Sequence, residues 1–92
     1  LEAIAAVVLK HPHLMVIADE IYEHINFTGD QTSMASLPGM FDRTITVNGF
    51  AKGFAMTGWR VGYIAAPKWI ADGSNKVQGQ LTSANCSISQ RG

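Results

Sequence analysis

The sequence feature that most constrains the fold is a short, uninterrupted apolar run that ends in two acidic residues. The run LMVIA, residues 14–18, is followed at once by Asp19 and Glu20. A continuous apolar stretch of this length is typical of a strand that is buried on both faces of a parallel sheet. We therefore predict a strand over residues 14–19, with Asp19 at its carboxyl end.

The other elements follow from similar local patterns. Residues 1–11 carry apolar side chains at helical spacing, and Pro12 then ends the predicted helix. The remaining predicted elements are a long connection over 24–43 with one helical turn near 33–37, strands over 43–49 and 59–66, and a helix from Pro67, at its first position, to about Leu81. This order indicates an α/β layered sheet.

Polar residues follow the ends of the first two predicted strands. Asp19 ends the first strand, and residues 48–52 follow the second. In open α/β sheets, ligands bind beyond the carboxyl ends of the parallel strands. The sequence therefore predicts a site at this edge, with a carboxylate and an amine converging on it.

Lys52 is the unusual cation of that edge. It lies in the stretch NGFAKGFAMTGWR, residues 48–60, and has no acidic residue within nine positions on either side. We expect its apolar neighbours to desolvate the amine, which disfavours the charged form and favours nucleophilic attack on a carbonyl carbon. The same pattern also fits a lysine whose stem packs while its ammonium reaches solvent.

Three further side chains are candidates, each with a structural alternative. Asp19 could pair with a protonated nitrogen heterocycle or a metal, or cap the backbone that follows it. Tyr22 would lie on the side of Asp19 if the chain turns helically there, and its phenol could donate to a ligand or pack in a core. Arg60 has the planar fork that suits a phosphate, and it also suits a salt bridge at the surface or at an interface.

Composition excludes several classes of function. Of the 92 residues, 47% are hydrophobic and 15% are charged, a balance that suits a segment of a larger protein. Seven basic and seven acidic residues are dispersed along the chain, which gives no basis for nucleic-acid or membrane binding. The single Cys86 allows no internal disulfide, and no metal-ligand spacing is present. We expect a soluble, cytoplasmic protein that binds no metal.

Two blocks together carry a family resemblance. VIADEIYEHINF, followed by TVNGFAKGFAMTGWRVGYIAAP, closely resembles the fold type I pyridoxal-phosphate aminotransferases of the aspartate aminotransferase branch. The resemblance extends over essentially the whole chain. It implies that residues 1–92 are the central part of the cofactor-binding large domain of a three-layer α/β fold, with a mostly parallel sheet and helices on both faces. The N-terminal part of that domain and the C-terminal small domain would then lie outside these residues.

The resemblance also implies a role for each candidate. Lys52 matches the Schiff-base lysine, which anchors pyridoxal phosphate and then shuttles a proton at the substrate. Asp19 matches the aspartate that keeps the pyridine nitrogen protonated, so that the ring can accept electrons. Tyr22 matches the tyrosine bonded to the ring's phenolic oxygen, and Arg60 the arginine that binds the phosphate. Many relatives have serine before the lysine, and Ala51 offers no such hydroxyl.

The implied activity is transamination between an amino acid, aspartate-like in preference, and a 2-oxo acid, in a homodimer. The isolated segment is expected to be inactive, because the family's substrate-binding arginine for the α-carboxylate lies elsewhere. No arginine lies between Arg60 and Arg91, so dicarboxylate specificity has no support from this segment. Two alternatives remain: another fold type I enzyme (a lyase, a synthase, or an alanine or aromatic aminotransferase), and the aminotransferase-like cofactor-sensing domain of a regulator.

Overall fold

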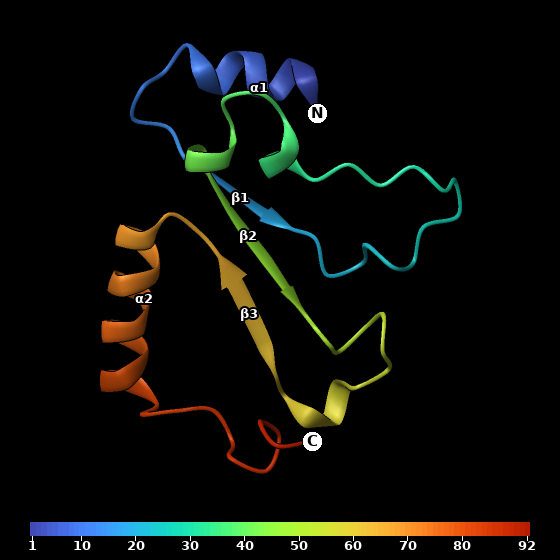
Figure 1. The fold of residues 1–92 in the computed structure, drawn as a ribbon, viewed down its shortest axis with the longest axis vertical. Coiled ribbons are helices and arrows are strands. Elements are labelled where there is room, and N and C mark those ends of the chain that lie inside the picture. Colours follow the sequence, from blue (N-terminus) through green and yellow to red (C-terminus); the bar gives the residue numbers. More distant parts are fainter.

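The computed structural model describes all residues from 1 to 92 and contains one three-stranded sheet (Figure 1). The regular elements are α1 (Glu2–Leu9), β1 (Val16–Asp19), β2 (Thr44–Gly49), β3 (Gly62–Ala65) and α2 (Lys68–Leu81), with short 3-10 helices η1 (Met34–Ser36), η2 (Phe41–Arg43) and η3 (Thr57–Trp59). Every predicted helix and strand is therefore present within a few residues of its predicted bounds. Helix α2 begins at Lys68, one residue later than predicted, because Pro67 is its N-cap and not its first helical residue.

The sheet has the order β1-β2-β3, and its two pairings differ in direction. β1 and β2 are parallel, with Asp19 opposite Val47. β2 and β3 are antiparallel, with Gly49 opposite Gly62. The sheet is therefore mixed within these residues, and the parallel pair carries the edge predicted to hold the site.

Side chains alternate between the two faces of the sheet, as the pleat requires. Val16 and Ala18 pack against a small core that contains α1 residues and two methionines of the β1–β2 connection: Ala5, Val8, Met34 and Met40. On the opposite face, Val47 and Ile64 line a cavity together with residues of α2. Helices therefore flank both faces, as predicted, although α2 buries none of its side chains within this chain.

Two polar side chains hold the β1–β2 connection in place. The guanidinium of Arg43 donates hydrogen bonds to the carbonyl oxygens of His11 and Leu14, which ties the start of β2 to the segment before β1. Glu20 Oε1 accepts hydrogen bonds from Ser33 Oγ, at 2.8 Å, and from the Met34 backbone N–H, at 3.2 Å. These contacts fix the connection where it returns to the sheet.

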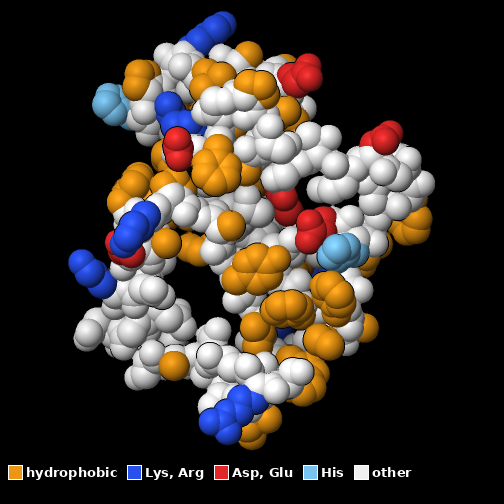
Figure 2. All heavy atoms as spheres, viewed as in Figure 1, with side chains coloured by type: hydrophobic (Ala, Val, Ile, Leu, Met, Phe, Trp, Pro, Cys, Tyr) orange, Lys and Arg blue, Asp and Glu red, His pale blue; other side chains and the backbone are white.

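The chain as a whole is flat and thinly packed. Its Cα atoms extend over 43 × 36 × 15 Å with a radius of gyration of 15.1 Å, larger than the roughly 13 Å expected of a compact 100-residue domain. Seven of the 92 residues are buried, and Figure 2 shows hydrophobic side chains spread across the visible surface. Much of the apolar surface therefore has no partner within these residues. No helix is both long and apolar enough to span a bilayer.

Candidate functional site

The site is built where β1 and β2 end at the same edge of the sheet. Asp19 is the last residue of β1, and its parallel partner Val47 lies two residues before the end of β2. The turn over residues 20–25 follows β1, and the loop over residues 50–61 follows β2. The prediction that Asp19 and residues 48–52 share one edge is therefore confirmed.

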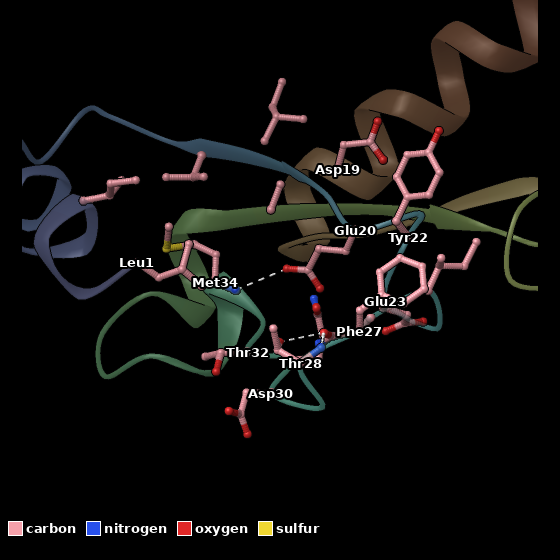
Figure 3. Close-up of a pocket in the computed structure, with 17 residues that line it drawn as sticks. Leu1, Asp19, Glu20, Tyr22, Glu23, Phe27, Thr28, Asp30, Thr32 and Met34 are labelled. Carbon is pink, nitrogen blue, oxygen red and sulfur yellow. Dashed lines mark hydrogen bonds between the residues drawn. The ribbon is translucent and has the colours of Figure 1, made fainter.

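Asp19 and Tyr22 both project from this edge. The Asp19 carboxylate is exposed, and its Oδ1 accepts one hydrogen bond, at 3.3 Å, from the backbone N–H of Ile21. That bond caps a turn instead of the helix considered in the sequence, because residues 21–24 form no regular helix. Figure 3 shows the Asp19 carboxylate and the Tyr22 ring on the same side, with Glu20 on the other. The turn therefore gives Tyr22 the predicted orientation.

Lys52 reaches Tyr22 from the other segment. Its Nζ lies 5.7 Å from the centroid of the Tyr22 ring, within the range of a cation–π contact. Within these 92 residues the Lys52 side chain is exposed, and Phe50 and Phe54 are partly open to solvent, so the desolvation expected for Lys52 is not supplied by this segment. The amine and the phenol ring are thus brought together at the surface of this chain.

Arg60 lies at the far end of the same loop. It follows η3 in the left-handed conformation, with φ 53° and ψ 45°, and its Nη1 donates a 3.0 Å hydrogen bond to the Thr57 carbonyl oxygen. Its guanidinium forms no hydrogen bond or ion pair with Asp19, Tyr22 or Lys52. No acidic residue of this segment pairs with Arg60, so the alternative of a salt bridge has no partner within residues 1–92. Its other N–H groups remain available to an anion.

A cavity of about 910 Å³ borders the turn, and Asp19, Tyr22 and Glu23 are among the residues that line it (Figure 3). Glu20 and Met34 line it, while Lys52 and Arg60 do not. Figure 3 shows Glu20 directed towards Met34 across this space. The cavity therefore includes Asp19 and Tyr22 of the candidate site together with the β1–β2 connection, but not the Lys52 amine or the Arg60 guanidinium.

The donor set fits pyridoxal phosphate by its chemistry. An exposed carboxylate can pair with a protonated ring nitrogen, a phenol can donate to a ring oxygen, an exposed amine can bond to a carbonyl carbon, and a guanidinium can bind a phosphate. No group of three or more metal-ligating side chains is present. Ala51, which precedes the lysine, contributes no hydroxyl to such a site.

Two further residues join the two segments of the site, and sequence patterns did not indicate them. The buried Asn48 donates from Nδ2 to Glu23 Oε1 at 2.7 Å, and Asn48 Oδ1 accepts the Gly49 backbone N–H at 2.7 Å. Asn48 and Glu23 are 25 positions apart, so no local spacing could reveal their contact. The only signal was the position of Asn48 at the end of a predicted strand.

Comparison with known proteins gives the family context. The family model of class I and II aminotransferases matches residues 1–92. The chain is 62% identical over 92 residues to the bifunctional aspartate aminotransferase and glutamate/aspartate-prephenate aminotransferase of Petunia hybrida, covering 99% of this chain and 19% of that protein.

Solved structures agree with this match. The aspartate aminotransferase of Rhizobium meliloti superposes with a TM-score of 0.91 at 43% identity, over 97% of this chain and 23% of that one. The aromatic aminotransferase of Pyrococcus horikoshii gives a TM-score of 0.89 at 50% identity, over 97% and 24%. The predicted fold class is thereby confirmed. The chain spans about a fifth of the length of the relatives that it matches.

Proposed function

The chain belongs to the class I and II aminotransferases, and we propose on that premise that the protein carrying it transfers an amino group between an amino acid and a 2-oxo acid with pyridoxal phosphate. The observation that carries the proposal is the position of the Lys52 amine, 5.7 Å from the Tyr22 ring at the sheet edge that also presents Asp19. Pyridoxal phosphate, when bound, supplies an electrophilic carbon and an electron-accepting ring.

Lys52 has two tasks in this proposal, and Asp19, Tyr22 and Arg60 have one each. The Lys52 amine would hold the cofactor and, when free, would take the proton from the substrate Cα. The Asp19 carboxylate holds a proton on the ring nitrogen. The Tyr22 phenol donates a hydrogen bond to the ring oxygen, and the Arg60 guanidinium binds the phosphate through parallel N–H donors. Asp19 stands on a strand, which holds its carboxylate more rigidly than the loop holds Lys52.

An aspartate-like substrate is the preferred one, because the petunia and Rhizobium relatives are aspartate aminotransferases by name. An aromatic substrate is the second candidate, since the Pyrococcus horikoshii structure, at 50% identity, is an aromatic aminotransferase. This segment contains no arginine between Arg60 and Arg91 that could read a second carboxylate. The side-chain pocket therefore depends on residues outside this chain.

The context of the segment is also part of the proposal. Residues 1–92 form the middle of the cofactor-binding large domain, and the rest of that domain and a small domain complete the enzyme. The exposed apolar surface of this chain supports the placement within a larger domain, since a soluble protein rarely leaves so much apolar surface open to water. The complete protein is a cytoplasmic homodimer, and the segment alone is inactive.

The test uses the full-length protein with pyridoxal phosphate. After reduction with borohydride and proteolysis, mass spectrometry should find the cofactor on the peptide that contains Lys52, and Lys52→Ala should abolish both this adduct and amino transfer. Arg60→Ala should chiefly weaken cofactor affinity. An adduct that persists in Lys52→Ala would overturn the assignment of the lysine.

Substrate assays then separate the alternatives. Aspartate and phenylalanine are compared as amino donors, each with 2-oxoglutarate. Glutamate formation with either one supports transamination and identifies the substrate class. Cofactor bound at Lys52 without turnover of any amino acid would favour a cofactor-sensing domain instead. The 92-residue segment, assayed in parallel, should form no glutamate.

A further inference from the structure

Tyr22 and Lys52 lie on two segments that neither a helix nor a strand holds in place. Tyr22 belongs to the turn over residues 20–25, and Lys52 to the loop that follows β2. Their separation of 5.7 Å therefore depends on contacts between the turn and the loop. Those contacts involve Glu23 and His24, the two residues that directly follow Tyr22.

The first contact is a hydrogen bond between a buried amide and a carboxylate. Asn48 Nδ2 donates to Glu23 Oε1 at 2.7 Å, a short distance typical of a charged acceptor. Asn48 Oδ1 is occupied by the Gly49 N–H, so both ends of the amide are engaged and its orientation is fixed. Because Asn48 stands on β2, the sheet itself anchors Glu23 and with it the turn.

The second contact is close packing of His24 on the loop. A Cβ atom at Gly53 would lie 2.8 Å from His24 Cδ2, so only glycine admits the imidazole in this position. The His24 and Phe54 rings meet edge to face with centroids 5.1 Å apart, and Phe54 continues to Phe50 at 5.9 Å. The turn therefore packs on both residues that directly follow Lys52.

The carboxylate also contacts its neighbour in the turn. Glu23 Oε1 lies 3.4 Å from His24 Nε2, so one oxygen atom faces both the Asn48 amide and the imidazole. Removal of the Glu23 side chain would free Asn48 Nδ2 and loosen His24 at the same time. The turn would then lose its polar tie to β2, and Tyr22 its fixed place over the Lys52 amine.

We propose that Asn48 and Glu23 are positioning residues, which hold the Tyr22 ring and the Lys52 amine in register across the two segments. The inference deepens the proposed function and rests on it for its catalytic meaning. Neither residue touches the reacting atoms; both act through the placement of Tyr22 and Lys52. A residue that served stability alone would not change the environment of Lys52 in the folded protein.

The test compares four forms of the full-length protein: wild type, Glu23→Ala, Glu23→Gln and Val8→Ala. Glu23→Gln keeps an acceptor oxygen for Asn48, and Val8→Ala removes buried apolar volume in the core beside α1, away from the site. In the cofactor-free protein, acetic anhydride labels lysines, and mass spectrometry gives the rate at Lys52 relative to the exposed Lys68. The visible spectrum of the cofactor-loaded forms, at one pH, is the second readout.

In Glu23→Ala we expect labelling of Lys52 to rise roughly two- to fivefold relative to Lys68, the factor that corresponds to loss of an exposed cation–π contact. Its visible spectrum should also change. Glu23→Gln should restore both readouts towards wild type. Val8→Ala should change neither, although it unfolds at lower urea.

Equal labelling and equal spectra in Glu23→Ala and wild type overturn the inference, as does an equal change in Val8→Ala. If Glu23→Ala fails to fold, Asn48→Asp must give the same rise, because its carboxylate cannot donate to Glu23 while its Oδ1 still accepts from Gly49. Failure of the proposed function is recognised separately, as absence of a borohydride-fixed adduct at Lys52 in wild type. Labelling without cofactor still measures the positioning in that case.

Discussion

Gly49→Ala tests whether the close approach of β2 and β3 sets the geometry at the site edge. A Cβ atom at Gly49 would lie 3.0 Å from both Gly62 Cα and Val61 O, and 3.4 Å from Ile21 Cδ1. The two nearest atoms belong to the backbone of the antiparallel partner, so the strands must separate by a few tenths of an ångström. Overpacking of this kind costs about 1–3 kcal/mol. The reduced entropy of the unfolded chain offsets about 0.4–1 kcal/mol of this.

We therefore expect Gly49→Ala to lower the free energy of unfolding by about 1.3 kcal/mol, the difference between the midpoints of these two ranges. The matched control is Gly73→Ala, which makes the same chemical change at an exposed position of α2 where no atom lies within 4 Å. Helix propensity predicts that it stabilises by about 0.8–1.0 kcal/mol. The free energy of unfolding should thus fall in Gly49→Ala and rise in Gly73→Ala.

Urea unfolding of the full-length protein, followed by circular dichroism, gives the midpoint and slope for each variant. The urea midpoint of Gly62→Ala should lie between those of Gly49→Ala and Gly73→Ala, since a Cβ atom at Gly62 would meet only the Asn48 carbonyl oxygen, at 3.2 Å. If Gly49→Ala and Gly73→Ala shift the midpoint in the same direction, the steric argument for the β2–β3 approach is wrong.

Three further predictions concern the connections around the site. Glu20→Ala should lower the free energy of unfolding by about 1–3 kcal/mol and speed amide exchange at Met34, because the Met34 N–H and Ser33 Oγ lose their acceptor. Glu20→Gln keeps an acceptor oxygen and should lower the free energy of unfolding less. Lys68→Ala should change the free energy of unfolding by no more than about 0.5 kcal/mol, and by nothing in 1 M salt, since its pair with Asp72 is exposed. The backbone N–H of Ser89, its hydroxyl and the backbone N–H of Ile88 lower the pKa of the exposed Cys86 thiol. Alkylation of Cys86 should therefore reach half-maximal rate at a lower pH in the folded than in the urea-unfolded protein, and Ser89→Ala should reduce that difference.

The fold could be predicted where local pattern decides it. The apolar run that ends at Asp19 and the β-branched run that ends at Gly49 each identify a strand and its carboxyl end. Parallel strands share that end, so the site edge followed without any knowledge of tertiary contacts. The direction of β3 did not follow, because a strand pattern is the same in both directions. The connection over residues 50–61 is also long enough for a parallel crossover.

The exposure of Lys52 shows why sequence neighbours are a poor guide to burial in a loop. Its flanking residues are apolar or glycine, yet Phe50 packs on Phe54 and Phe54 on His24, which leaves the amine exposed within these 92 residues. In a helix or strand, periodicity states which face a neighbour covers. A turn has no such period, so the apolar residues beside Lys52 did not determine its environment.

The backbone of the lysine loop explains why the site needs ties from outside the loop. Ala55 and Arg60 both have φ 53°, a left-handed conformation that costs a non-glycine residue roughly 1–3 kcal/mol and persists where the surroundings enforce it. Within the loop, the Met56 N–H donates to the Phe50 carbonyl oxygen at 3.2 Å, which closes the segment that contains Lys52. That bond orders the loop but does not place it against the turn. The Asn48–Glu23 hydrogen bond and the His24–Phe54 contact make that connection. The position of the Lys52 amine relative to the Tyr22 ring therefore depends on contacts between the segments and not on either segment by itself.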